Sequence, residues 1–271
     1  MKILIIGSEG FVGKNLVRGL SQKHDIYTSD QLDSSIHQNY SKCDITNYDS
    51  VEKVVRDVDT VIHLAAHSLV SSLDGSITNG RVNIIGLLNL LESCRKNSVP
   101  KVIFTSASSL IGDPQSFHVK EDHLPKPKTA YGITKLTSEH YLRLYNELYG
   151  IDYTIFRFFN IYGPFQKNGL IPSIFNKIKN NEPITIFGKG DQVRDYVYIE
   201  DILPFFEQAS SSDIGKNKVL NMGTGNGTTI LEIVKNISEI LEIKPKIQYQ
   251  DPRPGEIGNF VADTTLLHQT F

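Results

Sequence analysis

Two residues that can move a proton lie one helical turn apart in the segment "AYGITK". Tyr131 and Lys135 are spaced i and i+4, so a helix places both side chains on one face. A tyrosine with its usual pKa of about 10 is a poor base at neutral pH, but a neighbouring ammonium group favours its phenolate. This spacing is common in helices by chance, so the pair predicts a general base only where other motifs support it.

A run of hydroxyl side chains, "FTSASSLIGD", is the second candidate for chemistry. Side chains alternate along a strand, so Thr105 and Ala107 share one face and Ser106 points to the other. We expect Thr105 to face a ligand and Ser106 to be buried behind it. Beyond the strand, Ser108 and Ser109 enter a loop at the carboxyl edge of the sheet, where ligands bind. We expect Ser108 to contact the reacting group, with Ser109 as the second choice.

A glycine triplet, "GSEGFVG", follows the first predicted strand and precedes a helix. Glycines there let the backbone approach a pyrophosphate, which the free N–H groups of the helix N-terminus can bind. Asp30 ends the next predicted strand, and its carboxylate suits the hydroxyls of an adenosine ribose. No arginine lies between Arg18 and Arg56 to grip a 2′-phosphate. The pattern therefore predicts NAD rather than NADP.

A parallel sheet must bring these residues together. The chain alternates short apolar runs such as "TVIHLAA" with helical patterns such as "VNIIGLLNLLESCRKN". Repeated units of this kind predict a doubly wound (Rossmann-type) α/β fold, with helices on both faces of a parallel sheet. Turns become denser after Asn160. We therefore expect a nucleotide-binding domain at 1–165 and a smaller substrate-binding region at 166–271, with segments of the second able to return to the sheet.

Composition narrows the class of protein. The net charge of −2 over 271 residues offers no electrostatic case for a nucleic-acid partner. The two cysteines, Cys43 and Cys94, lack metal-ligand spacing, so we expect no metal site. Free thiols suit a reducing compartment, and no run approaches the roughly 20 apolar residues of a membrane span. A cytoplasmic protein without a membrane partner is expected.

Further motifs complete a family pattern: "CDI", "HLAA", "RFFNIYGP", "IFGKGDQVRDYVYIED", "NMGTG" and "RPGE". Over nearly its whole length the chain resembles the extended short-chain dehydrogenases/reductases of the nucleotide-sugar epimerase/dehydratase group. The resemblance implies epimerisation of a nucleotide-sugar, of the UDP-glucose or UDP-galactose type, at C4 through a transient ketone. Tyr131 would take the proton of the sugar hydroxyl while hydride passes to NAD and later returns to the other face. A homodimer formed through the Tyr131 helix is also implied.

The resemblance also assigns substrate contacts. It places Asn160 of "FFN" near the phosphates of the nucleotide-sugar. It makes Arg194 and Arg253 the residues that hold the diphosphate, for which a planar guanidinium is well suited. For Arg194 the alternative is an ordinary salt bridge to Asp195 or Asp201.

One position departs from the family pattern. Aligning "SLIGD" on the family motif puts Ala107 where a catalytic serine or threonine normally stands. Related dehydratases carry an acidic residue just after it, whereas Ser108 and Ser109 occupy the matching positions here. This argues against a usual dehydratase. A nucleotide-sugar reductase or a non-catalytic NAD-binding member stays open, although Tyr131 and Lys135 weigh against the second.

The expected site has three parts. Catalysis is assigned to Tyr131, Lys135 and Ser108. Cofactor contacts are assigned to Gly7, Glu9, Gly10, Phe11, Val12, Gly13, Asp30, Asp44, Ile45, Leu64, Ala65, Ala66, Asn83, Thr105, Ser106, Tyr131, Lys135 and Phe158. Substrate contacts are assigned to Ser108, Asn160, Arg194 and Arg253. His63 and His67 are expected to pack or to face solvent.

Overall fold

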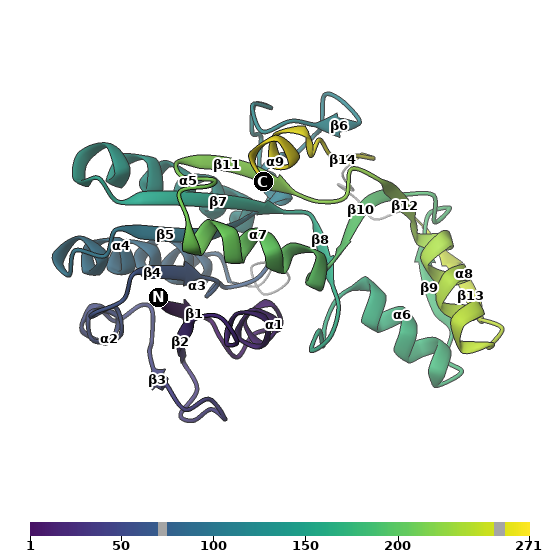
Figure 1. The fold of residues 1–271 in the computed structure, drawn as a ribbon. Helices are drawn as coiled ribbons and strands as arrows, with labels where there is room; N and C mark the ends of the chain where they lie inside the picture. The colour runs from purple at the N-terminus through teal and green to yellow at the C-terminus, as the bar shows by residue number, and fades with distance from the viewer. Residues whose placement is uncertain (70–74, 252–257) are drawn as a thin grey trace.

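A seven-stranded sheet forms the centre of the computed structural model, which describes residues 1–69, 75–251 and 258–271 (Figure 1). In spatial order its strands are β11 (Lys218–Met222), β7 (Asp152–Phe158), β5 (Lys101–Ala107), β4 (Thr60–His63), β1 (Lys2–Ile6), β2 (Asp25–Asp30) and β3 (Tyr40–Lys42). Every neighbouring pair is parallel. The strand order reverses between β1 and β4, where open sheets of this kind bind ligands. The predicted doubly wound α/β fold is confirmed.

Helices cover both faces of this sheet because its strands are apolar on both sides. One face packs against α2 (Tyr48–Val54), α4 (Gly86–Lys96) and α5 (Ala130–Tyr149). The other packs against α1 (Phe11–Leu20), α7 (Ile199–Ser211) and α9 (Thr265–Thr270). Along β1, Leu4 and Ile6 enter the first core while Ile3 and Ile5 enter the second. This alternation explains the continuous apolar runs that the sequence shows.

Short helices follow the inner strands β4 and β5. They are α3 (Ser76–Gly80), the π-helical η2 (Arg81–Ile85) and the 3-10 helix η3 (Ser108–Leu110). The last begins directly where β5 ends, so the serines that follow Ala107 sit on a tight turn at the carboxyl edge.

A smaller lobe lies beyond the carboxyl edge of the sheet, at the right of Figure 1. Its strands are β8 (Asn160–Tyr162), β9 (Ile184–Phe187), β10 (Val193–Tyr198), β12 (Gly227–Thr229) and β13 (Ile247–Gln250). Its helices are α6 (Leu170–Lys179) and α8 (Ile230–Leu241), which share an isoleucine-rich core with β9. A separate pair joins β6 (His118–Val119) to β14 (Val261–Ala262).

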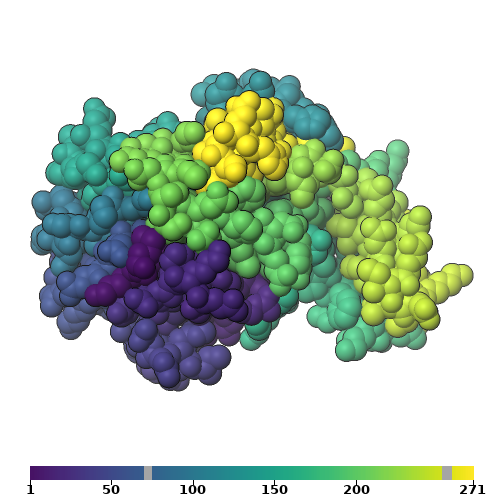
Figure 2. All heavy atoms as spheres, in the orientation of Figure 1, coloured from purple at the N-terminus to yellow at the C-terminus, as the bar shows by residue number. Residues whose placement is uncertain are grey.

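Three segments beyond residue 165 return to the large sheet. These are α7 and α9, which cover one face, and β11, which pairs with β7. The C-terminal α9, yellow in Figure 2, lies over the green segments, and the ring of Phe271 is 5.4 Å from that of Phe205 in α7. The division at 165/166 stays a prediction, and these segments belong spatially with the first part of the chain.

Candidate functional site

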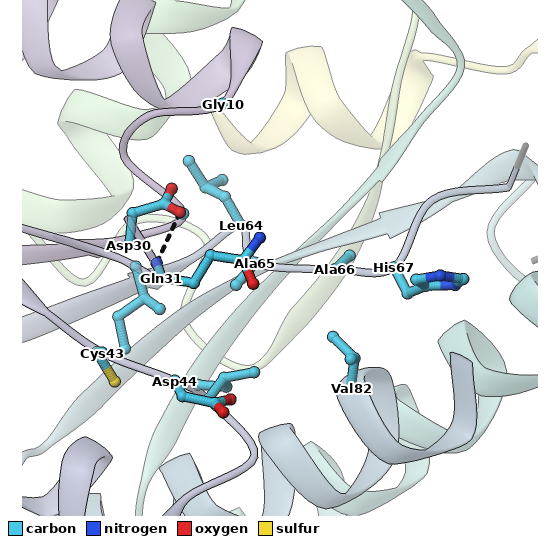
Figure 3. Close-up of a pocket in the computed structure, with 13 residues that line it drawn as sticks. Gly10, Asp30, Gln31, Cys43, Asp44, Leu64, Ala65, Ala66, His67 and Val82 are labelled. Carbon is cyan, nitrogen blue, oxygen red and sulfur yellow. Dashed lines mark hydrogen bonds between the residues drawn. The ribbon is translucent and has the colours of Figure 1, made fainter. Parts of the chain in front are cut away.

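A cavity of about 260 Å³ opens at the carboxyl ends of β1, β2 and β4 (Figure 3). Its lining is Ile6, Gly7, Gly10, Asp30, Gln31, Cys43, Asp44, Ile45, Leu64, Ala65, Ala66, His67 and Val82. Most of these residues carry a predicted cofactor contact. The cavity therefore lies at the switch in strand order, where the glycine motif and the "HLAA" strand meet.

Two glycines allow the close approach that shapes this cavity. Gly7 has a φ of +91°, and a Cβ there would lie 2.7 Å from the backbone nitrogen of Ala65. At Gly13 a Cβ would lie 2.3 Å from the carbonyl oxygen of Gly7. Any larger residue would push α1 away from β1. The N-cap of α1, Gly10, supplies no side-chain cap and no acid lies in the first turn, so this N-terminus suits an anionic ligand.

Asp30 stands at the edge of the same cavity. Its carboxylate accepts the backbone N–H of Glu9 at 3.0 Å and that of Gln31 at 2.7 Å, the second drawn in Figure 3. An ionised carboxylate has about four acceptor positions, so capacity remains for two ribose hydroxyls. Asp30 is therefore held by the loop that follows β1, beside the glycine turn.

The side chains of the other loop residues face elsewhere. The carboxylate of Glu9 accepts the Ser35 hydroxyl at 2.5 Å and lies 3.4 Å from the ammonium of Lys14. Phe11 and Val12 pack against the core beneath α1. If this stretch contacts a dinucleotide, its backbone provides the contact.

The predicted proton-transfer pair lies on α5, against the end of β5. Lys135 is 3% exposed, and its Nζ donates to the carbonyl oxygen of Thr105 at 2.7 Å. The same ammonium lies 4.5 Å from the ring centre of Phe104 and 5.5 Å from that of Tyr131. Helix periodicity thus places the two side chains together, and the strand end fixes the lysine.

Burial shifts the ionisation of both groups toward their neutral forms. It lowers the pKa of Lys135 to about 7, against the opposing attraction of the Glu139 carboxylate. Burial raises the pKa of Tyr131 to about 12. Ionisation of Tyr131 near neutral pH therefore needs further positive charge or hydrogen-bond donors beside the phenol.

Comparison with known proteins places this geometry in a family. The sequence model of the NAD dependent epimerase/dehydratase family matches residues 3–223. The chain belongs to this family. It is 34% identical to a putative UDP-glucose 4-epimerase of Methanocaldococcus jannaschii over 275 residues, which cover 96% of this chain and 89% of that protein.

Solved structures show the same relationship. A Thermotoga maritima UDP-glucose 4-epimerase crystallised with UDP-glucose superposes with a TM-score of 0.92 at 32% identity, covering 99% of this chain and 92% of the other. A Thermus thermophilus UDP-glucose 4-epimerase in complex with NAD gives 0.90 at 29% identity, covering 100% and 94%. The resemblance that the motifs indicated is confirmed.

Within the epimerase/dehydratase fold, the departure at Ala107 falls at the end of β5. Ala107 is the N-cap of η3 and pairs in register with Phe158 of β7, whose ring packs 6.0 Å from that of Phe206. Ser108 is partly exposed, whereas the Ser109 hydroxyl is buried and has no hydrogen-bond partner among the described residues. Such a hydroxyl costs about 1–3 kcal/mol unless a ligand satisfies it, which brings Ser109 level with Ser108 as a candidate.

Two of the predicted cofactor contacts, Ser106 and Asn83, have side chains that bind other parts of the protein. The Ser106 hydroxyl donates to Glu139 at 2.6 Å, on the opposite face of β5 from Thr105, as strand alternation requires. Asn83 accepts the N–H of His67 at 2.8 Å and donates to the Thr134 hydroxyl at 3.0 Å. Its amide braces the loop after β4 against α5 and does not line the cavity.

The histidines of the β4 segment have different environments. His63 is 1% exposed and packs 5.7 Å from the ring of Phe104, as expected. His67 lines the cavity. The Thr105 hydroxyl donates to the carbonyl oxygen of His63 at 3.3 Å.

Two of the predicted substrate contacts, Asn160 and Arg194, lie in the smaller lobe, on β8 and β10. Asn160 donates to the carbonyl oxygen of Asp195 at 2.9 Å. Arg194 donates to the carbonyl oxygens of Val193 at 2.7 Å and Gly258 at 3.2 Å, with its guanidinium 5.6 Å from the ring centre of Phe260. Arg253 lies outside the described residues.

Five residues line the cavity without having been predicted: Ile6, Gln31, Cys43, His67 and Val82. Gln31 and Cys43 adjoin Asp30 and Asp44 in sequence, so their position was a usable signal. Val82 comes from η2, which only packing brings to the cavity. In the described part of the chain, no cluster of three His, Cys, Asp or Glu could hold a metal, and no helix is long and apolar enough to span a membrane.

Proposed function

We propose that this chain catalyses the NAD-dependent epimerisation of a nucleotide-sugar at C4 through a transient 4-keto sugar. The observation that carries the proposal is the placement of Tyr131 and Lys135 at the end of β5, one strand from the cavity formed by the glycine turn and Asp30. A base and a dinucleotide cradle on one edge of a sheet are the two requirements of reversible alcohol oxidation.

The cradle fits the cofactor that the family requires. Gly7 and Gly10 would hold its pyrophosphate at the N-terminus of α1, and Asp30 its adenosine ribose. The small side chains of Ala65 and Ala66 leave room at the end of β4. When bound, NAD supplies a reversible hydride acceptor.

The chain's own residues handle the proton. The Tyr131 phenolate accepts the proton of the sugar C4 hydroxyl and returns it after the ketone has presented its other face. The Lys135 ammonium stabilises that phenolate, and the Thr105 carbonyl holds the ammonium in place. Burial of Lys135 keeps water away from its ammonium group.

For the substrate we propose a UDP-sugar of the glucose or galactose type. It would be bound by the smaller lobe, most of which comes from residues 166–271. Asn160, Arg194 and Arg253 would contact its diphosphate. The support is the position of Asn160 and Arg194 on neighbouring strands, β8 and β10, where the smaller lobe meets the sheet edge.

A homodimer formed through α5 is part of the proposal. Ile133, Leu144 and Leu148 on this helix are 53%, 42% and 58% exposed. Ile85 of η2 is 48% exposed. Large apolar side chains exposed along a helix that also carries the catalytic pair support burial against a second copy.

The deciding experiment incubates the purified protein with a panel of UDP-sugars in D2O and identifies products by NMR. Epimerisation gives a C4 epimer without deuterium at C4, because hydride leaves and returns within one site. Net consumption of NADH would identify a reductase instead. No product and no NADH with any sugar would refute an enzymatic role.

A further inference from the structure

A buried charged network lies directly behind the catalytic pair. The Glu139 carboxylate, 1% exposed, accepts two guanidinium N–H groups of Arg157 at 2.9 and 2.8 Å. It also accepts the Ser106 hydroxyl at 2.6 Å. These residues come from α5, β7 and β5, so one carboxylate joins three elements. Because a buried ion pair contributes little net stability, its presence calls for another reason.

The network repeats a connection that the catalytic lysine makes. Lys135 and Glu139 lie one turn apart on α5, and Thr105 and Ser106 are consecutive on β5. Lys135 donates to the Thr105 carbonyl at 2.7 Å, and Ser106 donates to Glu139 at 2.6 Å. Two successive turns of the helix are therefore tied to two successive residues of the strand. This double attachment sets both the height and the rotation of α5 on β5.

We propose that Glu139 is a positioning residue for the Tyr131–Lys135 pair, tying α5 to β5 and β7 and holding a carboxylate charge one turn from the lysine. The inference rests on the proposed function, because it takes Tyr131 and Lys135 as the groups that handle the proton. Ser106 and Arg157 act through Glu139.

The charges around Lys135 support this role. Among the described residues, the titratable groups near it include Tyr131 and Glu139 on α5 and His63 on β4. Burial lowers the pKa of His63 to about 3, so that ring is neutral near pH 7. The Glu139 carboxylate attracts the Lys135 ammonium and so opposes the fall in the pKa of Lys135 that burial causes. Arg157 meets the carboxylate from β7 and orients it.

The test removes the network without leaving a buried charge. Glu139→Gln alone would strand the Arg157 guanidinium and could unfold the protein. The triple variant Ser106→Ala, Glu139→Met, Arg157→Met replaces all three polar groups by apolar ones. We expect a thermal midpoint close to wild type, NAD affinity within about threefold by calorimetry, and kcat reduced at least tenfold. The alkaline decline of kcat should move to lower pH, since the Lys135 ammonium is less favoured.

A milder pair of variants isolates the attachment. Ser106→Ala removes one hydrogen bond to Glu139, whereas Ser93→Ala removes a buried hydroxyl on α4 that has no hydrogen-bond partner among the described residues. We expect three- to tenfold lower kcat with unchanged KM for Ser106→Ala, and wild-type kinetics for Ser93→Ala. If the triple variant keeps both the thermal midpoint and the kcat of the wild type, the network has no role in positioning the pair and the proposal is overturned.

A titration separates this inference from the proposed function. NMR of lysine labelled at Cε, with Lys135→Ala used for assignment, follows the ammonium without any turnover. The pKa of Lys135 should lie lower in the triple variant than in the wild type. An unchanged pKa overturns the positioning role even in an active enzyme. A wild type that epimerises no UDP-sugar refutes the proposed function, whereas a lowered pKa in the variant would still support the action of Glu139 on the lysine.

Discussion

Burial favours the neutral forms of Tyr131 and Lys135. Because the Tyr131 phenolate needs the Lys135 ammonium beside it, the rate should depend on both side chains. Tyr131→Phe keeps the ring and removes the proton acceptor. We expect NAD binding by calorimetry to be preserved and kcat to fall by about 10²–10⁴, the usual contribution of a general acid–base group. Lys135→Ala should weaken NAD binding and slow the reaction. A Tyr131→Phe protein with near-normal turnover would contradict the assignment.

The hydroxyl that stands in for the missing side chain at Ala107 can be found by matched substitutions. We expect Ser108→Ala to lower kcat at least about tenfold, which corresponds to about 1.4 kcal/mol at the transition state. Ala107→Ser should be neutral or activating, because it adds one hydroxyl at a partly exposed position. Ser109→Ala is the comparison, since its hydroxyl is buried without a partner. A larger loss of kcat there would transfer the role to Ser109.

At the scale of elements, the β1–α1–β2 unit should determine which dinucleotide binds. The loop after β1 presents its N–H groups to Asp30, which keeps the carboxylate at the edge of the cavity. We expect the wild type to bind NAD more tightly than NADP and Asp30→Ala to narrow that difference. Calorimetric titration of both cofactors measures it, and equal or tighter NADP binding by the wild type would rule out the assignment.

The burial of His63 in β4 should make the fold sensitive to acid. Burial, with a smaller contribution from Lys135, lowers the pKa of His63 from about 6.5 to about 3. Between these pH values, His63 is protonated in the unfolded chain but not in the folded chain. The free energy of unfolding therefore falls as the pH falls. Each pKa unit corresponds to about 1.4 kcal/mol. His63→Leu should flatten this dependence.

Urea unfolding between pH 7 and 4 measures the effect at His63. The two proteins should differ at pH 7 by packing alone, because the ring is neutral in both the folded and most of the unfolded chain. The free energy of unfolding of the wild type, relative to that of His63→Leu, should then fall as the pH falls. Parallel pH dependences would show that His63 does not titrate in this window.

At the scale of the whole molecule, the exposed side of α5 predicts a second copy. Leu144→Glu with Leu148→Glu places two charges among its exposed apolar residues. We expect the wild type to sediment as a dimer and the double variant as a monomer. The variant should still bind NAD, because neither substituted residue lines the cofactor cavity. The exposed Ile240→Glu in α8 is the control and should leave the dimer intact. A monomeric wild type would refute this surface.

Sequence spacing alone determined the features that depend on neighbours along the chain. The glycine turn and Asp30 belong to one strand–helix–strand unit, so their separation in sequence fixes their separation in space. Tyr131 and Lys135 share a face because helical periodicity places residues four apart together. The alternation of apolar runs and helical patterns predicted the parallel sheet for the same local reason.

Only the tertiary structure decided which groups meet across elements. The sequence carries no local signal that Ser106 of β5 and Arg157 of β7 bind Glu139 of α5, or that Asn83 braces His67. Nor does it place β11 beside β7. These contacts join residues far apart in the chain. They form because both faces of the sheet must be buried at once, which allows one packing of helices and strands. That packing sets the partner of each buried polar group.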